Sequence, residues 1–94
     1  MEFVQIVEFN TSRIDEMKDL GRKYEEEGGG GAGAMVCADR DNAGRYFIIA
    51  TFDDYDAAMK NSQDPKTQEL AAKMQELADG PPTFYNLDLL ERIS

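Results

Sequence analysis

The sequence predicts an α+β fold of the ferredoxin-like kind, with the element order β-α-β-β-α-β. In this fold one four-stranded antiparallel sheet carries its helices on one face. Two observations predict it. Segments that alternate around β-branched and aromatic residues flank two stretches whose apolar residues recur at helical spacing. The 94 residues also contain no internal repeat or linker, and a chain of this length forms a single domain over 1–94.

The first part of the chain supplies a strand and a helix. Residues Phe3 to Phe9 alternate in the manner of a strand. The run Asn10-Thr11-Ser12 offers helix caps, with Ser12 and Asp15 at the spacing of a capping box. Apolar residues at helical intervals follow, namely Ile14, Met17, Leu20 and Tyr24. We expect this helix to end where Glu25-Glu26-Glu27 meets the glycines at 28–31.

A hairpin and a broken helix come next. Met35–Ala38 and Arg45–Phe52 read as strands, and the turn residues of Asp39–Gly44 join them as a hairpin. Asp53 is expected to cap a short helix, and Asp64-Pro65 to begin a second one.

The last part of the chain completes the second helix and the sheet. An apolar stripe of Leu70, Met74 and Leu77 predicts the helix, and Gly80-Pro81-Pro82 ends it. Thr83–Leu90 then reads as the fourth strand, followed by a short tail.

The predicted sheet has apolar side chains on both faces, whereas one layer of helices covers only one. The third strand shows this most clearly, because Tyr46, Ile48, Ala50 and Phe52 alternate with Phe47 and Ile49. A bare apolar face would exceed the few hundred Å² that monomers usually expose. We therefore expect a C2 homodimer in which two sheets pack face to face as a dimeric α/β barrel.

Charge and composition exclude several classes of function. Lys and Arg number 10 against 19 Asp and Glu, which gives a net charge of -9. This excess argues against nucleic-acid and anionic-membrane partners. The chain has no histidine, which excludes histidine-dependent catalytic dyads, histidine-ligated zinc and a proximal-histidine haem. With one cysteine it forms no internal disulfide, and we expect no metal or cofactor.

The N-terminal residues Met1–Gln5 do not resemble a signal peptide. The longest apolar run, Tyr46–Ala50, is far shorter than the ~18 residues of a membrane helix. We expect a cytoplasmic protein.

Four motif-like patterns are expected to be structural. The glycines at 28, 30 and 33 match G-x-G-x-x-G, but they leave a helix and enter a strand, unlike a dinucleotide-binding turn. Asp39–Gly44 resembles a calcium loop only faintly and is expected to be a turn. The carboxylates of Asp53–Asp56 favour a helix N-terminus rather than a metal, and Cys37 is expected to be a buried, inert thiol.

The candidate ligand-binding residues are two amides among aromatic rings. They are Gln5, Tyr46, Tyr55, Phe84 and Asn86. The first and fourth strands are neighbours in this topology, so pairing of Ile6 near Leu87 would place both amides on one face beside Phe84. Such amides orient a small ring-bearing ligand or hold a phenolate-like oxygen. The alternative is that these residues only pack the core. Asn61 and Arg45 are expected to face water.

Several segments from the third strand onward match a known group. They are Phe52–Met59, Asn61-Ser62, Asp64-Pro65, the stripe Leu70, Met74 and Leu77, then Gly80–Phe84 and Asn86–Asp88. In these segments, and in element order over the whole chain, the sequence resembles the dimeric α/β-barrel proteins related to antibiotic-biosynthesis-type monooxygenases. The resemblance implies a small pocket between the sheet and its helices. It also implies cofactor-free oxidation of phenolic or quinol substrates, isomerisation or an unassigned role, because haem degradation needs the histidine that this chain lacks.

Two functions remain open. The first is a homodimer that acts on a small aromatic molecule as a cofactor-independent monooxygenase-like or isomerase-like protein. The alternative is a non-catalytic protein that binds a small ligand or assists oligomerisation. A cavity of ~300 Å³ or more, lined by Tyr46, Tyr55 or Asn86, favours the first function, and a collapsed interior favours the second.

Overall fold

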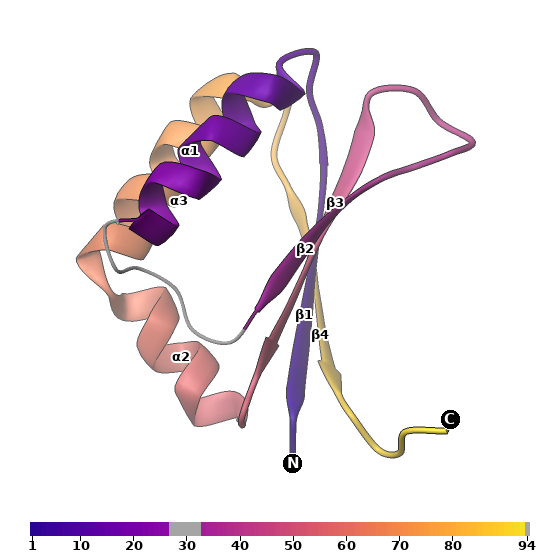
Figure 1. Ribbon diagram of the computed structural model, residues 1–94, viewed down its shortest axis with the longest axis vertical. Coiled ribbons are helices and arrows are strands. Elements are labelled where there is room, and N and C mark those ends of the chain that lie inside the picture. The colour runs from indigo at the N-terminus through magenta and orange to yellow at the C-terminus, as the bar shows by residue number, and fades with distance from the viewer. Residues whose placement is uncertain (27–32, 94) are drawn as a thin grey trace.

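One antiparallel sheet and one layer of helices make up the fold, in the order that the sequence predicts (Figure 1). The computed structural model describes residues 1–26 and 33–93. Its strands are β1 (Phe3–Asn10), β2 (Ala34–Ala38), β3 (Arg45–Phe52) and β4 (Thr83–Asp88). Its helices are α1 (Ile14–Glu26), α2 (Tyr55–Gln63) and α3 (Pro65–Leu77).

The four strands are arranged in the order β2-β3-β1-β4, and each neighbouring pair is antiparallel. The predicted hairpin of β2 and β3 is therefore confirmed. The pairing of β1 with β4 differs from the expected one, because Ile6 lies opposite Tyr85 rather than near Leu87. The difference is two residues, and a shift by an even number leaves every side chain on its predicted face.

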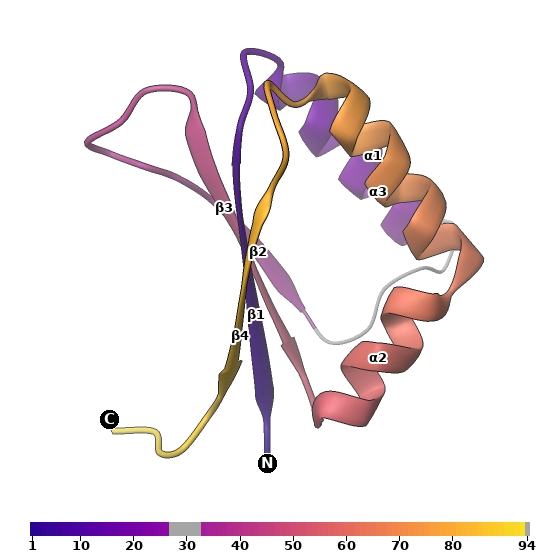
Figure 2. The same cartoon turned by 180° about the vertical axis from the view of Figure 1, so that it is seen from behind.

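The helices all lie on the same side of the sheet (Figure 2). Helices α1 and α3 run side by side, and α2 lies toward the end of the sheet at which β1 begins (Figures 1 and 2). The opposite face of the sheet carries no helix, and the C-terminal residues extend on that side. No helix in the described residues is long and apolar enough to cross a membrane.

Acidic side chains begin the second and third helices. The Oδ1 of Asp54, not of the predicted Asp53, accepts a hydrogen bond from the Ala57 amide at 2.7 Å. The extended backbone of Asp54 places its carboxylate where it can reach that amide. Asp64 begins α3 as predicted, since its Oδ1 accepts from the Lys66 amide at 2.8 Å and proline occupies the first helical position.

Thr11 fastens three segments together at one corner of the molecule. Its Oγ1 donates to the Leu77 carbonyl at 2.7 Å and accepts from the Arg13 amide at 2.9 Å. Its own amide donates to the Gly44 carbonyl at 2.9 Å. The end of β1 is thereby joined to the end of α3 and to the β2–β3 turn. The sequence predicts Ser12 as the capping residue of α1, but Ser12 is exposed. The hydroxyl that bonds to the Arg13 amide at the start of α1 belongs to Thr11 instead.

The fourth strand is shorter than predicted and ends at Asp88 instead of Leu90. The Leu89 amide still donates to the Glu2 carbonyl at 2.9 Å, after which the chain leaves the sheet. The predicted end of the first helix at Glu27 and the glycines at 28–31 lies outside the described residues, as do Gly28 and Gly30 of the glycine pattern.

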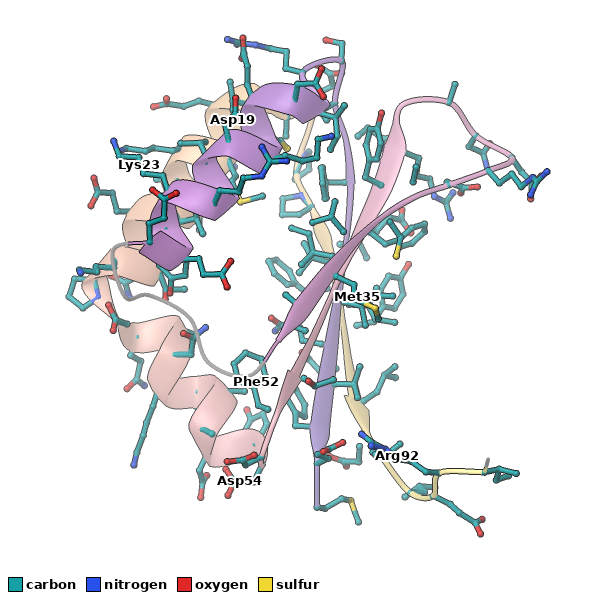
Figure 3. The ribbon with its side chains drawn as sticks, in the orientation of Figure 1. Asp19, Lys23, Met35, Phe52, Asp54 and Arg92 are labelled. Atoms are coloured by element: carbon teal, nitrogen blue, oxygen red, sulfur yellow. The ribbon has the colours of Figure 1, made fainter. Side chains whose placement is uncertain are left out.

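The buried core of the described residues is small. Phe3, Phe52 and Ala58 form a cluster beneath α2, and Phe9 and Met17 are buried as well. The ring of Tyr55 meets Phe3 edge-on at a centroid distance of 5.3 Å. Phe52 points from the sheet toward the helix layer (Figure 3). The cluster of Phe3, Phe52 and Ala58 therefore fixes α2 on the sheet. Helices α1 and α3 cover the other half of the helix-facing side of the sheet.

Candidate functional site

A cavity of about 520 Å³ lies between the sheet and the helices α1 and α3. The strands contribute Phe9, Ala34, Val36 and Ile48 to its lining, and Gly33, just before β2, also lines it. Its lining from the helices is Ile14, Met17, Lys18, Gly21, Arg22, Tyr24, Glu25, Leu70 and Met74. This volume is within the range of pockets that take small organic molecules.

The apolar lining follows from the register of the sheet and the periodicity of the helices. Val36 lies opposite Ile48 on neighbouring strands, and both side chains face the helices. On α1 the side chains of Ile14 and Met17 belong to the stripe that the sequence predicts for packing. That stripe faces the sheet and borders the cavity, although Met17 itself is buried.

A chain of hydroxyl and amide groups adjoins this cavity. Tyr24 lines it, and the phenol oxygen of Tyr24 lies 2.5 Å from Oγ1 of Thr67. The hydroxyl of Thr67 donates to Oδ1 of Asn61 at 3.3 Å. Because Thr67 has a single proton to give, Tyr24 is the donor to Thr67. The phenol oxygen is therefore free to accept a hydrogen bond from a ligand.

Asn61 and Arg45 do not face water as expected. Asn61 is half-buried, since its amide accepts the Thr67 bond between α2 and α3. Arg45 is also half-buried, with its guanidinium 3.5 Å from Glu8 Oε1 and 3.2 Å from Asp39 Oδ2. The Nε of Arg45 is buried without a hydrogen bond to any described residue, and the nearby carboxylate of Asp39 offsets the cost of burying this charge.

Three charged side chains of α1 complete the cavity lining. They are Lys18, Arg22 and Glu25. Lys18 pairs with Asp15 at 3.4 Å and Arg22 pairs with Asp19 at 3.0 Å. Among the described residues that line the cavity, Glu25 is the one carboxylate.

The five predicted ligand-binding residues all belong to the helix-facing side of the molecule, but none of them lines this cavity. The structure does bring the two amides together. Gln5 lies directly opposite Asn86, and its Nε2 donates to Asn86 Oδ1 at 3.2 Å. Phe84 is the next residue along that face of β4 and is 56% exposed. These three residues occupy the β1–β4 half of the face, whereas the cavity lies toward β2 and β3.

The two predicted tyrosines are apart from the amide pair. Tyr46 stacks on Phe9 at a centroid distance of 5.8 Å, so it supports the wall of the cavity without lining it. Tyr55 begins α2 and is 54% exposed.

The lining residues on α1 and α3 were not identified as a site from the sequence. Their spacing indicated an amphipathic helix, and packing is the common reason for that pattern. One signal was available, namely Gly21 in the middle of the apolar stripe. Glycine destabilises a helix interior, so a glycine at such a position indicates a packing or functional reason for the absence of a side chain.

The bare face of the sheet is apolar, as the alternation predicts. Its exposed members include Met35 at 59%, Leu87 at 46% and Tyr85 at 43%. Ile6 and Ile49 are paired near its centre and are half-buried. Figure 3 shows Met35 on the side of the sheet away from the helices.

A polar network borders this apolar face. The phenol of Tyr85 donates to Glu8 Oε1 at 3.1 Å, and this hydrogen bond raises the pKa of Tyr85 above its usual value. Asp39 accepts a hydrogen bond from the Asp41 amide at 2.9 Å, and this bond is the main cause that lowers the pKa of Asp39. The amide of Asn42 and the charge of Arg45 lower it further. Asp39 therefore organises the predicted turn with its own side chain.

Residues 1–26 and 33–93 contain no group of three or more His, Cys, Asp or Glu side chains that could hold a metal ion. Cys37 is half-buried rather than buried, because it lies on the bare face, opposite Phe47.

No protein-family model matches the chain, and no curated protein matches its sequence. Solved structures do match. SnoaB from Streptomyces nogalater, a cofactor-independent oxygenase, aligns with a TM-score of 0.80 and 16% identity over 98% of this chain and 96% of that one. A conserved protein from Methanosarcina mazei aligns with a TM-score of 0.80 and 12% identity over 93% of this chain and 91% of that one.

A candidate antibiotic biosynthesis monooxygenase from Caulobacter crescentus aligns with a TM-score of 0.78 and 17% identity over 96% of this chain and 91% of that one. Identities this low compare folds and not activities. The chain has the ferredoxin-like α+β fold of the antibiotic biosynthesis monooxygenase-type proteins.

Proposed function

We propose that this protein is a homodimer that binds a small aromatic molecule in the cavity between its sheet and α1 and α3, and oxidises it with molecular oxygen without a bound cofactor. The observation that carries the proposal is the cavity itself. It is about 520 Å³ in volume, mostly apolar, and bordered by a phenol whose oxygen is free to accept a hydrogen bond. The structural likeness to SnoaB, a cofactor-independent oxygenase, supports the oxidative part.

The proposed reaction converts a phenol to a quinone. A ring C–H and the phenolic O–H are lost, one oxygen atom of O₂ becomes the new carbonyl, and the other leaves as water with the two hydrogens. The neutral substrate is proposed to donate its phenolic O–H to the oxygen of Tyr24. Glu25 is then proposed to take that proton, and the O–H of Tyr24 to turn from Thr67 to the phenolate oxygen that results. The apolar lining excludes water from the resulting electron-rich ring.

The homodimeric part of the proposal rests on the bare sheet face. It exposes Met35, Tyr85 and Leu87, and no helix of the described residues covers it. Burial of such a face against a second copy stabilises both copies by removing apolar area from water.

The amides of Gln5 and Asn86 form a second candidate position for a ligand. Their hydrogen bond at 3.2 Å and the exposed ring of Phe84 next to Asn86 support this proposal. Asn86→Ala is expected to leave the fold unchanged. Unaltered binding of an aromatic probe in this variant would remove the amide pair from the site.

The proposal is tested with 1-naphthol as the probe. Native mass spectrometry measures its binding, and an oxygen electrode measures whether 1-naphthol and O₂ are converted to 1,4-naphthoquinone and water. Binding of 1-naphthol without oxygen uptake would contradict the proposed oxidation and favour the alternative function, a non-catalytic ligand-binding protein. Absence of both would overturn the proposed site.

A matched pair of variants locates the binding. Met74 lines the cavity, whereas Met59 lies on α2 and is 39% exposed. Met74→Trp fills part of the cavity and is expected to weaken 1-naphthol binding at least tenfold. Met59→Trp makes the same change elsewhere and is expected to leave binding unchanged. Equal effects of the two variants would contradict this location. Circular dichroism verifies that both variants fold.

A further inference from the structure

We propose that the cavity takes a ring-bearing carboxylate whose acid group is held by Lys18 and Arg22 and whose rings lie past Gly21 against the apolar strands. The proposal rests on the proposed function, because it specifies the class of molecule that this same cavity binds.

The two cations are placed together by helix geometry. Lys18 and Arg22 are four residues apart on α1, so their side chains share one face of the helix, and both line the cavity. The chain has only 10 cationic residues against 19 acidic ones. Among the described residues, the cavity lining contains these two cations and one carboxylate, Glu25, which lies a turn further along α1 than Arg22. The positive charges therefore outnumber the negative one in the lining, although acids outnumber bases in the whole chain.

The same geometry shows which flank of α1 carries these cations. Met17 and Tyr24 are seven residues apart and share a face, and Tyr24 reaches Thr67 on α3. One residue along a helix turns the side chain by about 100°. The cations are thus on the flank of α1 that is turned away from α3. A ligand would place its rings beside Met17 and its charge at the opposite flank.

The ion pairs that these cations now make are weak. The partner of Lys18 is Asp15, whose side chain is 90% exposed, and the partner of Arg22 is Asp19, whose side chain is 73% exposed. Exposed pairs of this kind contribute little stability, so a ligand carboxylate can replace the acids at small cost. The guanidinium of Arg22 can also bind a carboxylate through two parallel hydrogen bonds.

Gly21 is the second and independent observation. It lies in the interior of α1 between the two cations and lines the cavity. A Cβ at this position would have no heavy atom within 4 Å, so neither close packing nor a special backbone conformation requires a glycine here. What the glycine does provide is open space in the wall, at the place where a ligand would pass between Lys18 and the strands.

The positions along α1 also set the length of the ligand. The midpoint of Lys18 and Arg22 and the midpoint of Tyr24 and Glu25 are separated along the helix axis by about 7 Å. A two-ring aromatic acid spans such a distance. Its carboxylate would lie at the cations and its far ring edge at the phenol of Tyr24.

The test compares 2-naphthoate with its neutral isostere 2-naphthamide by isothermal titration calorimetry at pH 7. We expect the carboxylate to bind at least tenfold more tightly than the amide. Equal affinities would overturn the carboxylate proposal and leave the proposed aromatic site standing. If neither probe binds, the proposed function falls as well.

Charge-removing variants assign the preference to the two cations. The double variant Lys18→Gln and Arg22→Gln is expected to weaken naphthoate binding about tenfold or more and to leave naphthamide binding unchanged. Lys23→Gln is the matched control, because Lys23 is on the same helix but points away from the sheet (Figure 3). An equal loss in the Lys23 variant would attribute the effect to net charge and overturn the assignment.

The variant Gly21→Ala separates binding from stability. Alanine is the stronger helix former, so the variant is expected to raise the Tm by roughly 4 to 8 °C. Its methyl group enters the cavity wall, so naphthoate affinity is expected to fall at least threefold. Unchanged affinity in the stabilised variant would contradict the role given to the glycine.

Discussion

The phenol oxygen of Tyr24 lies 2.5 Å from the hydroxyl oxygen of Thr67, and this contact ties α1 to α3 beside the cavity. Tyr24→Phe removes the contact and leaves the ring in place. We expect the free energy of unfolding to fall by about 0.5–1.5 kcal/mol, measured by urea unfolding. Binding of 1-naphthol should weaken as well. Tyr55→Phe removes a hydroxyl from an exposed tyrosine and serves as control. Equal behaviour of the two variants would contradict the role of Tyr24.

Thr11 is expected to be a stability residue. It is 2% exposed, and its hydroxyl bonds both the Leu77 carbonyl and the Arg13 amide. Thr11→Val keeps the shape but leaves these groups without the hydroxyl, which should cost about 1–3 kcal/mol. Chemical denaturation measures the loss. Thr83→Val, on the exposed strand β4, should change stability by less than about 0.5 kcal/mol. An unchanged stability of the Thr11→Val variant would show that the backbone hydrogen bonds alone join β1, α3 and the β2–β3 turn.

Asp39 gives stability a defined pH dependence. Its pKa in the folded protein is lowered from 3.8, chiefly by the Asp41 amide. A lowered pKa stabilises the fold at pH values above the unfolded pKa, and the contribution disappears as pH falls through the folded pKa. Asp39→Asn is therefore expected to be less stable than the parent at pH 7, and the two proteins are expected to be equally stable at pH values below the folded pKa of Asp39. Unfolding curves at several pH values measure this.

The control for this pH effect is Asp41→Asn, which keeps the backbone amide that Asp39 uses. It should not reproduce the pH-dependent difference. A difference in stability between Asp39→Asn and the parent that stays constant from pH 7 to the lowest pH at which both proteins fold would contradict the assignment.

Met35 tests the dimer without disturbing the monomer. Its side chain is 59% exposed on the bare face, so Met35→Lys removes few contacts within one chain. In a face-to-face dimer the new charge would be buried without a partner, which is strongly unfavourable. Analytical ultracentrifugation should show at least a tenfold higher dissociation constant. Met59→Lys, on α2, makes the same change on the opposite side of the molecule and should leave the dimer intact. A monomeric parent protein would overturn the proposed homodimer.

The fold was predictable because local signals agree with one another. Alternation identified the strands, and Asp64-Pro65 identified the start of α3. Errors were confined to boundaries, where neighbouring residues offer the same chemistry. Asp53 and Asp54 are both carboxylates before a helix, and only the backbone angles of Asp54 select it. Sequence alone does not give those angles.

The candidate site was less predictable, because the same pattern serves packing and ligand binding. The amides of Gln5 and Asn86 were placed together correctly, since register and face follow from topology. The distance between the helix layer and the sheet does not follow from periodicity. It decides whether a cavity remains beside Ile14 and Met17, and here one does.

The position of β1 inside the sheet has a consequence for synthesis on the ribosome. This strand is made before β4, yet one of its two edges pairs with β4, and β2 and β3 come between them in the chain. Until Thr83–Asp88 has emerged, the nascent protein holds an unpaired edge in the middle of its future sheet. Unpaired strand edges favour association with other chains. The growing polypeptide therefore depends on the synthesis of β4, or on a chaperone, to cover that edge.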